Sequence, residues 1–150
     1  MAKIVFLCVN NSNRGQMAVG LANSILGNQH EIYSAGSNPK AEINLDAIKA
    51  MADIDIDISK QKITAIADLP LEILNDADFI ITLCENEICP FLNTRAQMIH
   101  WPIQNPNDIH SYDNSETYKH TRDIIKEKLE SFAKTHINNN NVISLQTSSR

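Results

Sequence analysis

The chain has 150 residues, of which 43% are hydrophobic and 21% charged, and its formal net charge is −5. This length suits one domain with a hydrophobic core, and the composition is that of a globular rather than a disordered protein. The negative charge gives no electrostatic reason to expect binding to nucleic acid or to an anionic membrane. No apolar run approaches the ~18 residues of a membrane span and no signal-peptide pattern is present, so we expect a cytoplasmic protein.

The first part of the chain predicts a strand, a helix and a second strand. The apolar run from Lys3 to Val9 predicts a strand that is buried on both faces. Apolar residues then recur at helical spacing from Met17 to Leu26, and Gly27 follows as a stop signal. Residues 31–35 predict a second short strand.

The middle of the chain predicts a further helix and two further strands. The helix begins near Asn44 and runs through Met51. Residues 54–58 alternate between isoleucine and aspartate, which fits either an extended strand or a half-buried connection. The apolar segments Asp78–Leu83 and Gln97–Trp101 predict the two strands.

The C-terminal helix has the clearest pattern in the chain. Apolar residues recur at helical spacing from Tyr118 to Phe132, and Asp113 or Ser115 can cap the first turn. We expect one domain over residues 1–135 and a flexible, Asn-rich tail over residues 136–150. Because strands alternate with helices, we predict an α/β fold with a doubly wound, four-stranded parallel sheet flanked by helices.

Cys8 and Arg14 frame the loop between the first predicted strand and helix. Successive backbone N–H groups in such a turn form an anion-binding nest, to which the helix N-terminus adds positive potential. Arg14 can hold a tetrahedral oxyanion through two parallel hydrogen bonds, and the same field favours a nucleophilic Cys8 thiolate. The predicted anion-binding residues are Val9, Asn10, Asn11, Ser12, Asn13 and Arg14.

A simpler interpretation of this loop is a buried cysteine followed by polar residues and an unrelated arginine. Two observations favour the functional interpretation. The cysteine lies at the carboxyl end of a predicted strand, where ligands bind in parallel α/β sheets. Three asparagines, which tolerate left-handed backbone angles, stand between Cys8 and Arg14.

The sequence contains three cysteines, an odd number that argues against a structural disulfide framework. Cys84 falls at the carboxyl end of a predicted strand, as Cys8 does, and Cys89 follows in a polar segment. Two cysteines without further clustered ligands make a poor zinc site, and the five histidines are scattered. We therefore expect no metal site.

The loop and the Gln16-Met17-Ala18 segment after it resemble the signature of the low-molecular-weight phosphotyrosine phosphatase superfamily, and especially its thioredoxin-coupled arsenate reductases. The resemblance extends to about Phe132. It includes the segments Ser34-Ala35-Gly36, Thr82-Leu83-Cys84, Cys89-Pro90 and His100-Trp101.

This resemblance implies a relay of three cysteines that reduces arsenate to arsenite, with no bound cofactor. Cys8 attacks arsenate, Cys84 attacks the thiol–arsenate adduct, and Cys89 resolves the product into a disulfide that thioredoxin reduces. A phosphatase needs neither Cys84 nor Cys89. The presence of a cysteine at every relay position therefore favours a reductase.

The chain departs from the family pattern at several positions. Gly15 stands where the family usually has a serine or threonine that assists the thiolate. Val19 replaces an acidic residue that helps to bind potassium in some reductases, so we expect no potassium site. Asn105 replaces the aspartate that serves as general acid for the leaving oxygen, and an amide cannot act as an acid, although it can hydrogen-bond an oxyanion. Asp108 is close enough in sequence to substitute for it.

Three functions stay open at this point. The first is an arsenate reductase with thioredoxin as external reductant. The second is a low-molecular-weight protein tyrosine phosphatase that hydrolyses aryl phosphates through a cysteinyl-phosphate. The third is a catalytically weakened relative that only binds an oxyanion or senses redox state. In each case we expect a monomer whose ligand is a small oxyanion such as arsenate, phosphate or sulfate.

Overall fold

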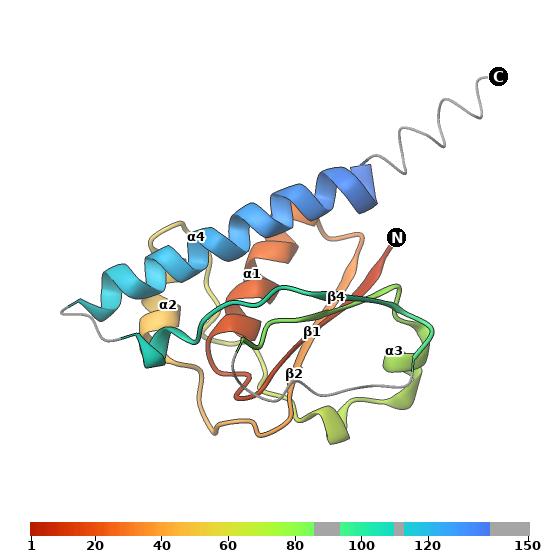
Figure 1. Ribbon diagram of the computed structural model, residues 1–150, viewed down its shortest axis with the longest axis horizontal. Helices are drawn as coiled ribbons and strands as arrows, with labels where there is room; N and C mark the ends of the chain where they lie inside the picture. Colours follow the sequence, from red (N-terminus) through yellow and green to blue (C-terminus); the bar gives the residue numbers. More distant parts are fainter. Residues whose placement is uncertain (86–93, 110–112, 139–150) are drawn as a thin grey trace.

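The computed structural model describes residues 1–85, 94–109 and 113–138. In this part of the chain, four strands form one parallel sheet in the order β2-β1-β3-β4 (Figure 1). The strands are β1 (Lys3–Cys8), β2 (Glu31–Gly36), β3 (Phe79–Thr82) and β4 (Gln97–His100). The predicted α/β fold with a four-stranded parallel sheet is therefore confirmed, and each strand ends within two residues of its predicted position.

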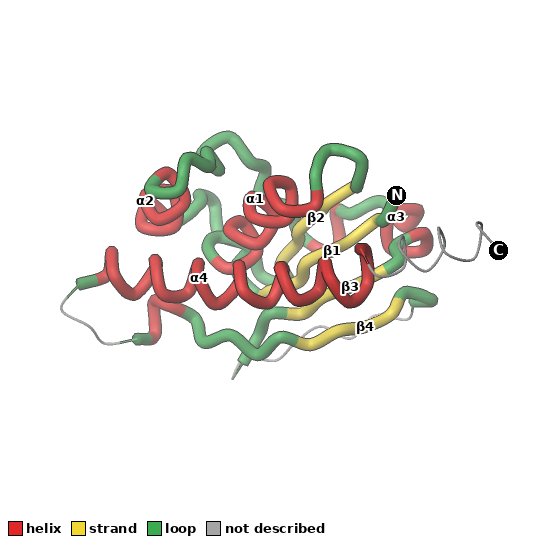
Figure 2. The backbone as a smooth tube through the Cα atoms, turned by 90° about the horizontal axis from the view of Figure 1, so that it is seen from above, coloured by secondary structure: helices red, strands yellow, loops and turns green. Residues whose placement is uncertain are grey.

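Helices cover both faces of the sheet (Figures 1 and 2). Alternate residues of β1 serve the two faces: Ile4 and Phe6 belong to the larger core cluster, Val5 and Leu7 to the smaller one. The larger cluster lies under α1 (Arg14–Leu26), α2 (Leu45–Ala52) and α4 (Asn114–Phe132), and the smaller one lies under α3 (Leu71–Asp76).

The sequence pattern does not predict α3. This helix has six residues, begins directly after Pro70, and contains no fully buried residue. It therefore shows none of the apolar periodicity that marks the longer helices. The predicted caps of the other helices are present: Asn44 accepts N–H bonds at the start of α2, and Asp113, rather than Ser115, does so at the start of α4.

Residues 54–58 form a turn and a half-buried connection, so the alternative of an extended strand is wrong. Asp55 has a φ of 63°, which breaks the extended course of the chain. Ile58 is fully buried, and its Cγ2 atom would lie 2.7 Å from a Cβ atom added to Gly20. The isoleucines of this segment thus pack on the surface of α1 rather than on a strand at the sheet edge.

The packed chain continues beyond α4 through a π-helical turn, Ala133–Asn138. The His136 ring packs against Phe79 and Phe132 at centroid distances of 5.2 and 5.0 Å, and Ile137 is 9% exposed. Packing thus reaches two residues past the domain boundary predicted at position 135, and residues 139–150 lie outside the described part. Among the described helices, none has both the length and the apolar character needed to cross a membrane.

Candidate active site

Cys8 and Cys84 lie at the same edge of the sheet, where β1 and β3 end side by side. Leu7 of β1 is in register with Thr82 of β3, and the Leu83 N–H group donates to the Leu7 carbonyl at 2.9 Å. Cys8 is 1% exposed and Cys84 is fully buried. Two of the three predicted relay cysteines thus lie at the carboxyl ends of neighbouring parallel strands.

The loop from Cys8 to Arg14 is held from outside through its carbonyl groups. The carbonyls of residues 8–12 each accept a hydrogen bond of 2.9–3.2 Å from the backbone N–H groups of Ser37, Asn38, Lys40 and Asn44 and from the side-chain amide of Gln16. In a trans peptide, the N–H group points away from the carbonyl of the same plane. The N–H groups of residues 9–13 are therefore turned to the inner side, where they can surround a tetrahedral oxyanion at the N-terminus of α1.

The Cys8 sulfur lies on this inner side. The Asn11 N–H group donates to Cys8 Sγ at 3.2 Å, a hydrogen bond that favours the thiolate form. Asn11 has a φ of 50°, in the left-handed region that asparagine tolerates. Gly36 makes the tight loop possible, because a Cβ atom there would lie 2.5 Å from the Val9 carbonyl oxygen.

Arg14 is the first residue of α1, and its side chain is 1% exposed. Its Nη1 atom donates to the Leu83 carbonyl at 3.2 Å and to the Ile103 carbonyl at 2.8 Å. These two carbonyls come from the segments that follow β3 and β4. The guanidinium is thereby fixed beside the loop, where its planar donors suit a bidentate contact with an oxyanion.

Asn105, which directly precedes Pro106, contacts the loop through its side chain. It is 9% exposed, and its Oδ1 atom accepts from Asn13 Nδ2 at 3.1 Å and from the Asn107 N–H group at 3.0 Å. Asn13 Oδ1 in turn accepts from the Arg14 N–H group. Asp108 is exposed on the short helix η2 (Pro106–Asp108), so only Asn105 of the two leaving-group candidates contacts the loop.

Two side chains hold the site through contacts that the sequence pattern does not reveal. Gln16 is fully buried and bridges the Asn11 carbonyl to the Lys62 carbonyl, at 3.0 and 3.2 Å, while Gln61 Nε2 donates to Gln16 Oε1 at 2.8 Å. The Tyr118 hydroxyl donates to Asn107 Oδ1, which ties η2 to α4. Helical periodicity explains Tyr118 as a core residue, and no local pattern signals either cross-link.

Because residue 15 is a glycine, it supplies no hydroxyl group beside the Cys8 thiol. A Cβ atom added to Gly15 would lie 3.0 Å from Cys8 Sγ and 2.9 Å from Asn11 Oδ1. A serine would therefore reach the sulfur only if the Asn11 side chain moved. The Asn11 Oδ1 atom is buried and accepts no hydrogen bond from the described residues.

The remaining candidates lie outside the described site. Cys89 falls among residues 86–93, which are not described. Val19 is partly buried and packs against the larger core cluster. Within the described ranges, no cluster of three or more His, Cys, Asp or Glu side chains is suitable for holding a metal ion.

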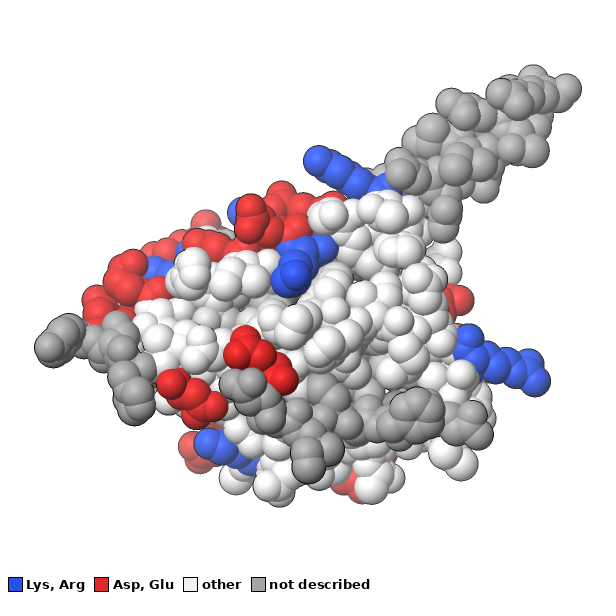
Figure 3. Space-filling view, in the orientation of Figure 1, with Lys and Arg blue, Asp and Glu red and all other residues white. Residues whose placement is uncertain are grey.

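The surrounding charge does not favour anions. Figure 3 shows acidic side chains gathered along α4, whose outer face carries the exposed residues Glu116, Asp123, Glu127 and Glu130. Together with the net charge of −5, this means that long-range attraction cannot bring an oxyanion to the loop. Binding would depend on the inward N–H groups and on Arg14.

Comparison with known proteins gives the family. A family model for the low molecular weight phosphotyrosine protein phosphatases matches residues 3–142. Arsenate reductases from Oceanobacillus iheyensis and Bacillus subtilis are 38% and 36% identical to the chain, each over 88% of this chain and 95% of the relative. A solved structure of an arsenate reductase in the phosphate binding state is 26% identical with a TM-score of 0.70, covering 88% of this chain and 96% of that one. The chain therefore belongs to the low molecular weight phosphotyrosine protein phosphatase family.

Proposed function

We propose that this protein is an arsenate reductase in which Cys8 is the nucleophile. The observation that carries the proposal is the loop of inward N–H groups around Cys8 Sγ, with a second thiol at the end of the adjacent strand. An isolated nest and thiolate would serve any tetrahedral oxyanion. The second cysteine and the two arsenate reductases that share more than a third of the sequence support reduction rather than hydrolysis.

In the first proposed step, the Cys8 thiolate attacks arsenic and water leaves, so a sulfur–arsenic bond replaces an arsenic–oxygen bond. The Cys84 thiolate then attacks the Cys8 sulfur. The electron pair of the sulfur–arsenic bond passes to arsenic, which leaves as arsenite, and a Cys8–Cys84 disulfide forms. Cys89 next displaces Cys8, and the dithiol of thioredoxin reduces the Cys84–Cys89 disulfide. The relay needs cysteines in the reduced state, which a reducing compartment such as the cytoplasm maintains.

The experiment is thioredoxin-dependent arsenite formation by the purified protein, compared with Cys84→Ser and Cys89→Ser. We expect multiple turnovers only in the wild type. Cys84→Ser should accumulate no arsenite, whereas Cys89→Ser should release one equivalent and stop with Cys8 and Cys84 joined. Mass spectrometry after thiol alkylation checks the disulfide. Unchanged turnover of Cys84→Ser would refute the relay.

The second candidate function is hydrolysis of aryl phosphates through a cysteinyl-phosphate. It is favoured by the match to the phosphatase family and by a loop whose donors do not distinguish phosphate from arsenate. This function predicts hydrolysis that survives the double substitution Cys84→Ser with Cys89→Ser but not Cys8→Ser. Measuring both reactions on one preparation separates the two candidates.

A further inference from the structure

We infer that Asn105 donates a hydrogen bond to the bound oxyanion but cannot transfer a proton to it. Asn105 thereby selects inorganic oxyanions over phosphate monoesters with poor leaving groups. The inference deepens the proposed function and rests on Cys8 being the nucleophile. It concerns which substrates the site can turn over.

The orientation of the Asn105 amide is set by its neighbours. Its Oδ1 atom accepts two hydrogen bonds, from Asn13 Nδ2 at 3.1 Å and from the Asn107 N–H group at 3.0 Å. Both partners are donors, so the oxygen must face them and the Nδ2 atom must take the opposite side. No described residue accepts a hydrogen bond from Asn105 Nδ2. The amide thus offers N–H donors, beside Asn13 of the anion loop, to a group outside the described chain.

This orientation is held by a chain of hydrogen bonds across three elements. Asn13 Oδ1 accepts from the Arg14 N–H group at the start of α1, and Tyr118 of α4 donates to Asn107 Oδ1 in η2. Tyr118 is 1% exposed, so the far end of the chain of bonds is anchored in the core. A side chain fixed at both ends in this way is suited to positioning a ligand.

Proton balance decides which substrate such a donor can serve. Attack of the Cys8 thiolate on H₂AsO₄⁻ gives a thiol-bound arsenate dianion and water, and both protons of that water come from the substrate. A phosphate monoester has a second pKa of about 6, so near pH 7.5 it is a dianion without a proton to give. Its leaving oxygen must then depart as an alkoxide or phenoxide unless the enzyme supplies an acid.

Asp108 is the alternative acid in the same segment. Its side chain is exposed, and its backbone N–H group donates to the Asn105 carbonyl at 2.9 Å. Asp108 is thus the last residue of η2 and Asn105 caps its start, but only Asn105 directs its side chain to the loop. Asp108→Asn is the matched control, because it removes an acid without altering the contact with Asn13.

The test is a series of aryl phosphates whose leaving phenols span weak to strong acids, with the burst of phenol release measured near pH 7.5. We expect the wild-type rate to fall steeply as the leaving group worsens, and Asp108→Asn to leave that slope unchanged. Asn105→Asp should flatten the slope and raise the rate with the poorest leaving groups about 10²-fold or more, most strongly at acidic pH. The two donors at this position, Asn13 Nδ2 and the Asn107 N–H group, favour the ionised form of a carboxyl group placed there. The carboxyl group would therefore be protonated, and able to act as an acid, mainly at low pH.

A second measurement needs no variant. Acids added as buffer should accelerate phenol release by the wild type from the poorest esters and leave arsenite formation unchanged. A flat slope in the wild type, a slope steepened by Asp108→Asn, or no response to buffer acid overturns the inference. If arsenite formation is absent while the steep slope and the gain in Asn105→Asp are present, the reductase proposal fails and the role of Asn105 stands.

Discussion

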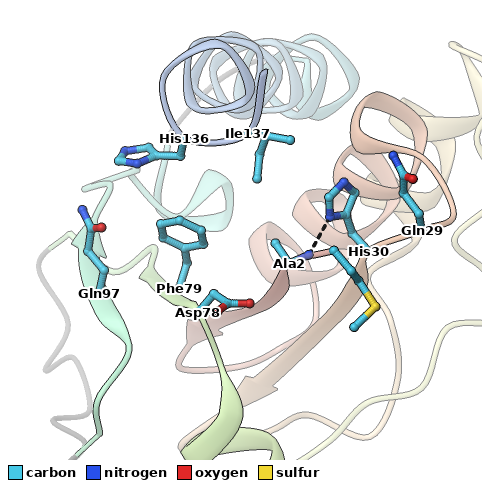
Figure 4. Close-up of a pocket in the computed structure, with 9 residues that line it drawn as sticks. Ala2, Gln29, His30, Asp78, Phe79, Gln97, His136 and Ile137 are labelled. Carbon is cyan, nitrogen blue, oxygen red and sulfur yellow. Dashed lines mark hydrogen bonds between the residues drawn. The ribbon is translucent and has the colours of Figure 1, made fainter. Parts of the chain in front are cut away.

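The two ends of the sheet differ: the amino end has a pocket, and the carboxyl end has the candidate reactive site. At the amino end lies a pocket of about 440 Å³, lined by residues that include His30, Asp78, Phe79 and His136 (Figure 4). Its polar groups mostly hold the chain in place: His30 Nδ1 accepts from the Ala2 N–H group at 2.9 Å, and Asp78 Oδ2 accepts from the Lys3 N–H group at 2.8 Å. At the carboxyl end, by contrast, the loop carbonyls are bonded outward and its N–H groups face inward.

The direction of the strands explains this difference. In a parallel sheet, every strand leads from its carboxyl end towards the N-terminus of a following helix, so the positive ends of backbone dipoles gather at that edge. The amino end receives helix C-termini instead. A pocket at the amino end is therefore a poor place for an anionic intermediate, whatever its volume.

The strongest test of the comparison is Cys8→Ser. We expect arsenite formation to fall by about 10⁴-fold or more, since removing a nucleophile takes away most of the catalytic advantage. Binding of inorganic phosphate, measured by calorimetry, should persist, because the N–H groups of residues 9–13 remain. Retention of measurable turnover would place the reactive thiol elsewhere.

Arg14→Lys is expected to lower kcat/KM by about 10²–10³-fold, the loss typical of removing one fixed donor to a developing oxyanion. Lysine keeps the charge but cannot make the two bonds to the Leu83 and Ile103 carbonyls and a bidentate contact together. Steady-state kinetics at fixed ionic strength give the ratio. A loss below about threefold would mean that charge alone suffices.

Gln16→Leu tests whether the loop needs its outside supports. We expect a loss of about 1–3 kcal/mol in the free energy of unfolding, because the Asn11 and Lys62 carbonyls lose their shared donor in a buried position. Phosphate affinity should fall as well. Gln61→Ala removes the neighbour but leaves both of these bonds, and it should change affinity much less, as calorimetry would report.

His30→Ala addresses the amino end. The substitution leaves the Ala2 N–H group without its acceptor, so urea denaturation should report a loss of about 1 kcal/mol. Arsenite formation below the melting temperature should stay equal to that of the wild type. A selective loss of turnover in a fully folded variant would contradict the division of roles between the two ends.

The smallest expected effect concerns alkaline pH. Burial raises the pKa of Tyr118 above its ordinary value near 10. The folded state therefore holds this proton more tightly than the unfolded state, and the resulting stability is complete below about pH 10 and is lost as the pH rises further. Tyr118→Phe should be less sensitive than the wild type to a change from pH 9 to pH 11 in thermal unfolding. Equal sensitivity would assign the alkaline loss to other groups.

The sequence allowed prediction of those parts that depend on local pattern. Apolar runs located all four strands, and Cys8 with Arg14 located the loop, because each pattern lies within a few consecutive residues. The supports of the loop could not be predicted in this way. Gln16 meets Lys62, and Asn105 meets Asn13, across separations of 46 and 92 residues that no periodicity records. Helix α3 was missed for a different reason. It is short and buries no side chain completely, so its local pattern is too weak to predict a helix.

The central place of β1 has a consequence for the way the site can be lost. This strand is bonded to β2 on one side and to β3 on the other, and it ends at Cys8. Its amides should therefore be among the slowest in the chain to exchange with deuterium, and they should exchange only when the whole domain opens. The loop does not belong to a part of the chain that unfolds separately. Oxyanion binding and the folded state should therefore disappear at the same denaturant concentration.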